Sequence, residues 1–183
     1  MKIFLASQSL RRKELMQLIG LPFIVKSQEI DETIDHSKDL ETEIKRLAYE
    51  KAMAINEYDS IVIGADTIVV LDNQIYTKPK DKDDARRMIK CLSNNTHCVL
   101  TGVCILYQNQ IYNWCQKSEV KFMDLTDEQI EDYINTDEPY DKAGGYAIQG
   151  VGSLLIESIN GDYYSIMGLP IAQVNAQLKR MIK

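Results

Sequence analysis

The amino-acid sequence predicts an α/β protein with a mixed sheet, and three observations lead to that prediction. Apolar, β-branched runs such as 60–71 alternate along the chain with segments that repeat apolar residues at helical spacing, such as 40–56. Short turn signals, among them Asn160-Gly161, separate several apolar runs and indicate hairpins, so the sheet is not purely parallel. With 183 residues, 45% apolar and 26% charged, the chain fits one domain or at most two packed lobes.

Strands and helices alternate in the first part of the chain. We expect a strand over 3–7, a helix over 10–19, a strand over 23–25 and a helix over about 40–56. Gly20 followed by Pro22 is a stop signal for the first helix, and its apolar stripe is Leu15, Leu18 and Ile19. The second helix has one apolar face, made of Ile44, Leu47, Ala48, Ala52 and Ile55.

The segment 60–71, SIVIGADTIVVL, is the most strand-like stretch of the chain. Gly64-Ala65-Asp66-Thr67 is expected to break it in the middle, and such a break can turn a polar side chain into a cleft. Asp72-Asn73 then has the composition of a tight hairpin turn.

The second half mixes hairpins with helices. Asp81 and Asp84 open a helix, and Thr126-x-x-Gln129 is a capping box for another helix through Ile134. Pro170 suits the first turn of a final helix. The expected strands are 99–107, 110–115, 119–123, 153–159 and 163–167.

Charge and cysteine usage exclude several classes. Lys and Arg number 21 against 27 Asp and Glu, and this net charge of −6 argues against a broadly basic nucleic-acid-binding protein. An anionic ligand would therefore need a local cluster of cations. The four cysteines include no C-x-x-C pair, which indicates reduced thiols. No signal-peptide core or membrane-length apolar run is present, so we expect a cytoplasmic protein without membrane contact.

The first strand-to-helix junction is a potential phosphate site. Free N–H groups at a helix start, two hydroxyls including that of Ser7, and the guanidinium groups of Arg11 and Arg12 suit phosphate oxygens. The alternative is that Ser9 is only an N-cap and both arginines are solvated. The segment by itself slightly favours that alternative.

Other charged residues could complete such a site. Asp66 lies between apolar runs, where a lone carboxylate is costly unless it meets a cation, a metal, water or a hydrogen-bonding cap from Thr67. Lys51 and Lys78 supply further cations, and Glu32 and Asp66 supply oxygen ligands for Mg²⁺. This set indicates phosphoryl or nucleotidyl chemistry. No P-loop or G-x-G-x-x-G motif occurs, and His36 and His97 lack metal-ligand spacing.

Taken in order, eight motifs resemble the Maf (septum-formation) family of nucleoside triphosphate pyrophosphatases. They run through nearly the whole chain: LASQSLRRKEL from residue 5, IDET at 30–33, LAYEKA at 47–52, GADTIVV at 64–70, KPKD at 78–81, THCVLTG at 96–102, EPYDKAGGYAIQG at 138–150 and GLP at 168–170. The resemblance implies a single Maf-like domain over 1–183. Its fold would be two-lobed, with a mixed sheet and a cleft between lobes, similar to inosine triphosphate pyrophosphatases.

The resemblance also implies an activity and a set of site residues. The family cleaves a nucleoside triphosphate to the monophosphate and pyrophosphate with a divalent metal, Mg²⁺ or Mn²⁺. Asp66 would be the proton acceptor, and Glu32 its acidic partner and, with Asp66, a metal ligand. The matching phosphate-binding positions are Ser7, Arg11, Arg12, Lys51 and Lys78. The family pattern is compatible with a homodimer.

Only a few residues indicate which nucleotide is the substrate. Arg11, Thr67 and Gln149 match the branch acting on dTTP and UTP, and the amide of Gln149 can pair with a pyrimidine edge. Leu10 and Gly145 depart from the family's usual Pro and Ala, and Leu10 lacks the ring with which Pro would fix φ at the helix start. Two alternatives stay open: a nucleotide-binding regulator of septum formation with little turnover, and the same reaction on 7-methyl-GTP or CTP.

Overall fold

The computed structural model describes residues 1–35 and 37–182, so His36 lies outside the described residues. The chain divides into two compact units. Unit 1 comprises Met1–Thr67, Thr101–Gln116 and the segment from Gly168 onward, and unit 2 comprises Ile68–Leu100 and Lys117–Met167. The expectation of one domain over 1–183 stays a prediction.

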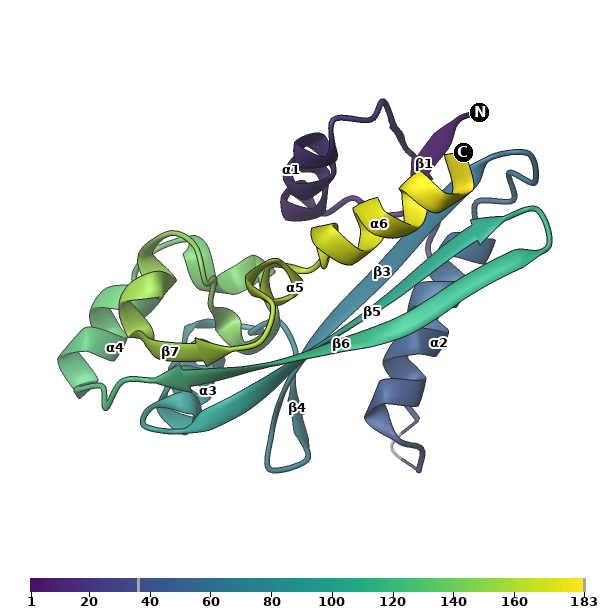
Figure 1. Ribbon diagram of the computed structural model, residues 1–183. Coiled ribbons are helices and arrows are strands. Elements are labelled where there is room, and N and C mark those ends of the chain that lie inside the picture. Colours follow the sequence, from purple (N-terminus) through teal and green to yellow (C-terminus); the bar gives the residue numbers. More distant parts are fainter. Residues whose placement is uncertain (36, 183) are drawn as a thin grey trace. The chain divides into compact units, whose positions relative to one another are not determined.

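A mixed sheet runs through the fold (Figure 1). Within the described residues it has seven strands in the order β2-β1-β3-β5-β6-β7, with β4 paired to β3. The strands are β1 (Ile3–Leu5), β2 (Ile24–Val25), β3 (Ile61–Leu71), β4 (Gln74–Tyr76), β5 (Thr96–Tyr107), β6 (Gln110–Phe122) and β7 (Ile156–Asn160). β1 pairs in parallel with β2 and β3, whereas the β3–β4 and β6–β7 pairs are antiparallel. The predicted α/β class with a mixed sheet is confirmed.

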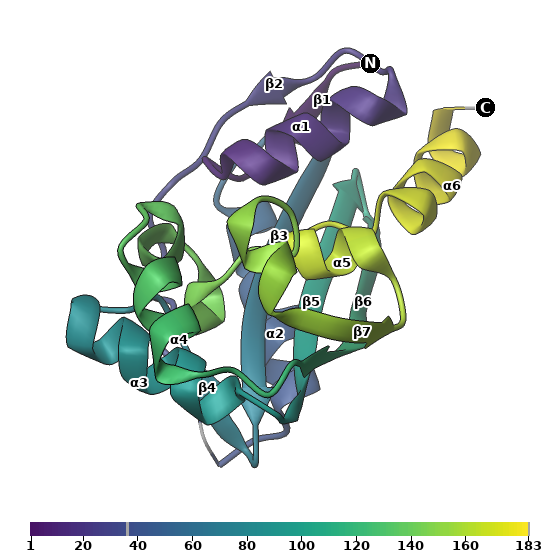
Figure 2. The same cartoon turned by 90° about the vertical axis from the view of Figure 1, so that its left-hand side faces the viewer.

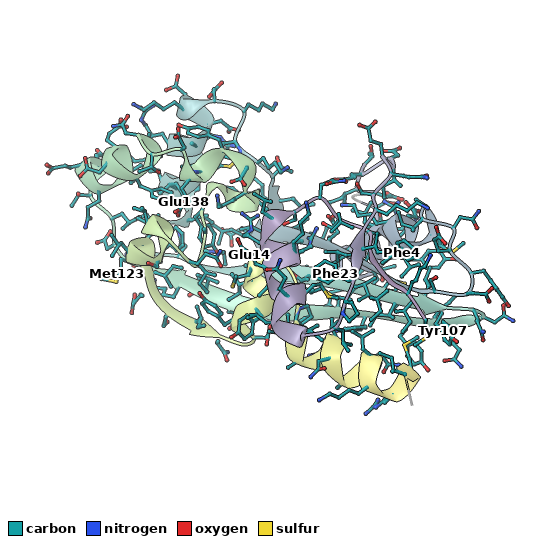
Figure 3. The ribbon with its side chains drawn as sticks, turned by 90° about the horizontal axis from the view of Figure 1, so that it is seen from above. Phe4, Glu14, Phe23, Tyr107, Met123 and Glu138 are labelled. Atoms are coloured by element: carbon teal, nitrogen blue, oxygen red, sulfur yellow. The ribbon has the colours of Figure 1, made fainter. Side chains whose placement is uncertain are left out.

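In the described part of unit 1 there are three α-helices: α1 (Leu10–Ile19), α2 (Leu40–Met53) and α6 (Ile171–Ile182). α2 covers one face of the unit's strands, and α1 and α6 lie together on the other face (Figures 1 and 2). The predicted apolar face of α2 is buried in full. Phe4 of β1, marked in Figure 3, belongs to the same core, together with Ala6, Ala48, Ala52, Ile55, Val62 and Cys104.

Unit 2 contains α3 (Lys82–Leu92), α4 (Asp127–Ile134), α5 (Tyr163–Met167) and the 3₁₀ turns η1 (Glu138–Asp141), η2 (Ala143–Gly145) and η3 (Val151–Leu155). α3 and α4 lie side by side (Figure 2). Buried His97 contributes to the core through edge-on ring contacts with Phe122 and Tyr146, at centroid distances of 5.1 and 5.3 Å. This packing gives His97 a structural role in the core of unit 2.

Local signals placed several element ends correctly. The Asp81 side chain accepts the Asp84 N–H at the start of α3, and the capping box of Thr126 and Gln129 opens α4. Asp72 and Asn73 have φ of 50° and 62° and join β3 to β4, as a tight hairpin turn requires. All of these contacts lie within four residues, so the local sequence is enough to specify them.

Three expectations about strands were wrong. β3 is continuous through Gly64-Ala65-Asp66-Thr67, and β6 is one strand where two were expected. The segment 163–167 is helix α5, because the Asp162 side chain accepts the Ser165 N–H and caps a helix. Gly161, with φ of 130°, packs against Ser118, so Asn160-Gly161 leads from β7 into that cap and does not close a hairpin.

One helix face also differs from the prediction. The buried residues of α1 are Leu15 and Met16, while Leu18 is 67% exposed. Apolar residues lie on more than one side of this helix, so its packing decided which of them are covered. Among the described residues all four cysteines are free, and no helix combines the length and hydropathy needed to span a membrane.

Candidate functional site

Two carboxylate side chains of unit 1 meet at the ammonium group of Lys51. Lys51 lies in the last turn of α2, and its Nζ lies 2.6 Å from Asp66 Oδ1 and 2.8 Å from Glu32 Oε1. The side chains of Lys51 and Asp66 are only 13% and 14% exposed, whereas that of Glu32 is 61% exposed. The largely buried carboxylate of Asp66 is therefore compensated by a cation and not by a Thr67 cap.

Close packing of α2 on β3 brings this pair together. A Cβ placed on Gly64 would lie 2.2 Å from the Ala48 carbonyl oxygen and 2.8 Å from the Ala52 nitrogen. Only a glycine lets the helix backbone approach the strand this closely. Asp66, two residues along the strand, points to the same face as Gly64, and Lys51 reaches it from the helix.

A second group of polar side chains surrounds the guanidinium of Arg12 in α1. Its Nε donates to the Gly168 carbonyl oxygen at 2.9 Å, Nη1 donates to Ser7 Oγ at 3.2 Å, and Nη2 donates to Thr67 Oγ1 at 3.1 Å. The Thr67 hydroxyl also lies 2.9 Å from Thr101 Oγ1 of β5. These acceptors are neutral, so they orient the guanidinium without cancelling its charge.

The electrostatic surroundings link this group to the carboxylates. Desolvation lowers the pKa of Arg12, and the negative charges of Asp66 and Glu32 act against that shift. The positive charge of neighbouring Arg11 lowers the pKa further. Arg12 nevertheless keeps its charge, because a guanidinium does not lose its proton in proteins. Two adjacent cations held near two carboxylates suit an anion that arrives with a metal ion.

Because β3 is continuous, Asp66 can contact Lys51 while the next residue, Thr67, contacts Arg12. Successive side chains on a strand point to opposite faces, so Asp66 meets α2 while Thr67 meets Arg12 of α1. β1 pairs with β3 only over Ile61–Ile63, and the chain leaves the sheet there towards Ser7 and α1. Residues 64–67 thus extend past the end of β1, and the polar side chains of Asp66 and Thr67 lie there on the two faces of the strand.

At the first strand-to-helix junction the structure confirms the cap, while the phosphate site stays a prediction. Ser9 is the N-cap of α1, and its Oγ accepts the Arg12 N–H at 3.5 Å. Arg12, however, is held by other segments of unit 1 and is not a solvated side chain. Leu10, at the position where the resemblance expects proline, is 72% exposed and starts the helix without distorting it.

Two predicted site residues belong to unit 2. Lys78 is exposed and follows β4, in a segment held by a hydrogen bond from the Gly144 N–H to the Thr77 carbonyl oxygen at 3.1 Å. Gln149 is half-buried between η2 and η3. Within unit 1 the structure brings together Glu32, Lys51 and Asp66, and separately Ser7, Arg12 and Thr67, with Arg11 beside Arg12 in α1.

Sequence reasoning missed two members of the Arg12 group. Thr101 is fully buried and pairs with Thr67, and the carbonyl of Gly168 accepts from Arg12. Both lie in motifs that carry the family resemblance, THCVLTG and GLP, which is the signal that could have singled them out. Their roles depend on contacts 34 and 156 residues apart in the chain, which no local pattern encodes.

The donor set can be tested against the divalent metal that the resemblance implies. In residues 1–35 and 37–182, no three His, Cys, Asp or Glu side chains are arranged to hold a metal by themselves. Glu32 and Asp66 nevertheless approach the same ammonium group, so two carboxylate oxygens face one point. Mg²⁺ binds through one or two carboxylates together with substrate phosphates and water, and these two residues fit that mode.

Comparison with known proteins gives the same family as the ordered motifs of the sequence. Residues 2–181 match the family model described as "Maf-like protein". A Thermosipho africanus protein named dTTP/UTP pyrophosphatase is 49% identical over 95% of this chain and 90% of its own length. A Bacillus cereus protein with the same name is 45% identical over 98% of this chain and 95% of its own.

A solved structure shows the fold independently. The Staphylococcus aureus Ham1 protein superimposes with a TM-score of 0.55 and 13% identity, over 99% of this chain and 100% of that one. At this low identity the likeness concerns the fold alone, and it confirms the predicted fold class. The match to the family model over nearly the whole length, with relatives at 45–49% identity, shows that the chain belongs to the Maf-like protein family.

Proposed function

We propose that this chain is a nucleoside triphosphate pyrophosphatase that hydrolyses dTTP and UTP to the monophosphate and pyrophosphate. The observation that carries the proposal is the Asp66 carboxylate, held by Lys51 and placed on the strand whose next residue contacts Arg12. The names of the relatives, dTTP/UTP pyrophosphatase, supply the substrates and support the reaction type.

In this reaction Asp66 would be the general base. A carboxylate that is ionised at neutral pH can accept the proton of a water molecule as that water attacks the α-phosphorus. The ammonium of Lys51, 2.6 Å away, compensates the charge of this carboxylate and fixes its orientation. As the phosphorus–oxygen bond to the leaving group breaks, negative charge accumulates on pyrophosphate and must be compensated by nearby cations.

Arginine and lysine side chains provide that compensation in this proposal. Among the described residues, Arg12 donates three of its five N–H bonds to Ser7, Thr67 and Gly168, and the other two can point to phosphate oxygens. Ser7, Arg11 and Lys78 complete the proposed phosphate-binding set. Arginine is suited to this task because its planar guanidinium can form paired, charge-assisted hydrogen bonds.

Glu32 and Asp66 would hold a divalent metal, Mg²⁺ or Mn²⁺, when substrate is bound. The metal would supply charge compensation for the phosphate oxygens. Glu32 is the more exposed of the two carboxylates, so it can turn towards an arriving metal–nucleotide complex at small cost.

Base recognition is assigned to Thr67 and Gln149. The side-chain amide of Gln149 offers one acceptor and two donors, which can match the carbonyl and N–H groups of thymine or uracil. We also propose that the enzyme acts in the cytoplasm on free nucleotides, binding neither nucleic acid nor membrane, and that it works as a homodimer.

A nucleotide panel tests the proposal. Purified protein is incubated with Mg²⁺ and dTTP, UTP, CTP, GTP or 7-methyl-GTP, and pyrophosphate release is measured. We expect release from dTTP and UTP, and a fall of about 10²–10⁴-fold in Asp66→Asn. Asp72→Asn is the matched control, because Asp72 is exposed and its φ of 50° is readily adopted by asparagine.

Two results would contradict the assignment. Absence of pyrophosphate from every triphosphate, with nucleotide binding intact, would favour the regulator of septum formation. Full activity in Asp66→Asn would exclude this carboxylate as the proton acceptor. Faster turnover of CTP or 7-methyl-GTP than of dTTP and UTP would support the proposed reaction but contradict the proposed substrates.

A further inference from the structure

Glu138, in the motif EPYDKAGGYAIQG, has contacts that the proposed chemistry does not use. It lies at the start of η1 in unit 2 and is marked in Figure 3. Its carboxylate accepts three hydrogen bonds, from Tyr133 Oη at 3.2 Å, from the Val151 N–H at 3.0 Å and from the Gly152 N–H at 2.7 Å. Two of these donors are backbone groups that follow Gln149 by two and three residues.

The chain after Gln149 is shaped to fit this carboxylate. Gly150 has φ of 83° and ψ of −152°, a conformation that is essentially restricted to glycine. A Cβ on Gly150 would lie 2.3 Å from Glu138 Oε2, and one on Gly152 would lie 2.9 Å from Oε1 and 2.4 Å from the Ala147 carbonyl oxygen. Both glycines therefore let the backbone close around the carboxylate oxygens.

The chain before Gln149 is held by a different contact. The hydroxyl of Tyr146 lies 2.7 Å from Nε2 of buried His97, and its ring packs edge-on against Phe122 at 4.8 Å. Gln149 thus lies in a four-residue span, 147–150, that is fixed at one end by Tyr146 and at the other by Glu138. A side chain that must present donors and acceptors to a base gains selectivity from such a fixed backbone.

We propose that Glu138 is a positioning residue that sets base selectivity by fixing the backbone on which Gln149 is carried. The inference deepens the proposed function and depends on Gln149 as the reader of the base. A carboxylate suits the task because it only accepts hydrogen bonds and has two oxygens for three donors. Tyr133 remains a donor, since burial and then the Glu138 charge raise its pKa.

Glu138→Gln tests this role with little change in shape. It replaces one acceptor oxygen by an NH₂ group, which meets a backbone N–H, so donor faces donor. Glu128→Gln is the matched control, because Glu128 is an exposed carboxylate on α4. UTP and CTP are the probes, since they differ only in the hydrogen-bonding edge of the base.

Three readouts are compared: the ratio of kcat/KM for UTP over CTP, kcat and KM separately, and amide hydrogen exchange at Val151 and Gly152. We expect Glu138→Gln to lower the UTP-over-CTP ratio about tenfold or more, mainly through KM for UTP, and to accelerate exchange at both amides about tenfold or more. Glu128→Gln should match the wild type in all three. Gly150→Ala, whose Cβ would displace Glu138, should reproduce the loss of selectivity and decides the question if Glu138→Gln does not fold.

A folded Glu138→Gln protein with an unchanged UTP-over-CTP ratio would overturn the inference, as would equal losses on both nucleotides, which indicate a purely structural role. Failure of the proposed function looks different, because the wild type would then release no pyrophosphate from any triphosphate. In that case the ratio of UTP to CTP binding affinities, with exchange at Val151 and Gly152, still tests whether Glu138 positions Gln149.

Discussion

Lys51 Nζ lies 2.6 Å from Asp66 Oδ1, and both side chains are almost entirely shielded from water. The same ammonium group contacts the far more exposed Glu32 at 2.8 Å. Shielding strengthens the attraction within the pair, but it also makes removal of one partner costly, because the other charge is then left without compensation. The pair therefore connects the stability of unit 1 with the orientation of the proposed catalytic carboxylate.

Lys51→Met should destabilise the protein by about 2–4 kcal/mol, because it leaves the shielded Asp66 carboxylate without its cation. Adding Asp66→Asn should restore about 1 kcal/mol or more, since the uncompensated charge is then gone. Urea unfolding of the wild type, both single variants and the double variant measures the interaction free energy between Lys51 and Asp66. Lys90→Met is the control, because the Lys90–Asp127 pair is largely exposed and contributes at most about 1 kcal/mol. Strictly additive effects of Lys51→Met and Asp66→Asn would contradict the pairing.

Gly64→Ala should unfold the protein at markedly lower urea, with a loss of about 3 kcal/mol or more. Its Cβ would lie 2.2 Å from the Ala48 carbonyl oxygen, so the backbone of α2 must move away from β3. Gly20→Ala isolates the backbone effect, because Gly20 has φ of 76° and nothing within 4 Å of its Cβ. That control should cost only about 1–2 kcal/mol. Equal losses in the two variants would show that close packing of α2 is not the cause.

Arg12→Lys should reduce kcat/KM for dTTP by about 10²-fold. A lysine ammonium cannot reproduce three hydrogen bonds in fixed directions to Ser7, Thr67 and Gly168, so the charge remains but its placement is lost. Steady-state kinetics with Arg180→Lys, on the exposed end of α6, provides the comparison. Activity within twofold of the wild type would show that charge alone is sufficient at this position.

Acidification should weaken the fold through His97. Burial lowers the pKa of His97 to about 4 from its ordinary 6.5, so below pH 6.5 the unfolded chain binds a proton that the folded protein does not. Stability is therefore lost as pH falls from 6.5 to 4, and this residue should account for about 2 kcal/mol between pH 7 and 5. Urea unfolding at both pH values should give a smaller drop for His97→Gln, which does not titrate. An equal drop in the two proteins would place the pH dependence elsewhere.

Most element ends of the fold followed from local sequence. The N-cap of α1, the capping box of Thr126, the Asp72-Asn73 turn and the Gly20 stop were predicted because each is a backbone conformation or hydrogen bond set by residues at most four positions apart. The errors about strands arose where local sequence rules were applied to residues whose role depends on tertiary packing. Gly64 suggested a break in β3, but its missing Cβ accommodates α2 and the strand continues.

The sequence alone determined which chemical groups are available: the cations, the carboxylates and the order of the motifs that define the family. The tertiary structure decided which of them meet. Asp66 and Thr67 are neighbours in the chain yet face α2 and α1 on opposite sides of β3, and Arg12 is oriented by a carbonyl 156 residues away. Such contacts depend on how helices pack across a continuous strand, and packing is a property of the whole core that no short segment carries.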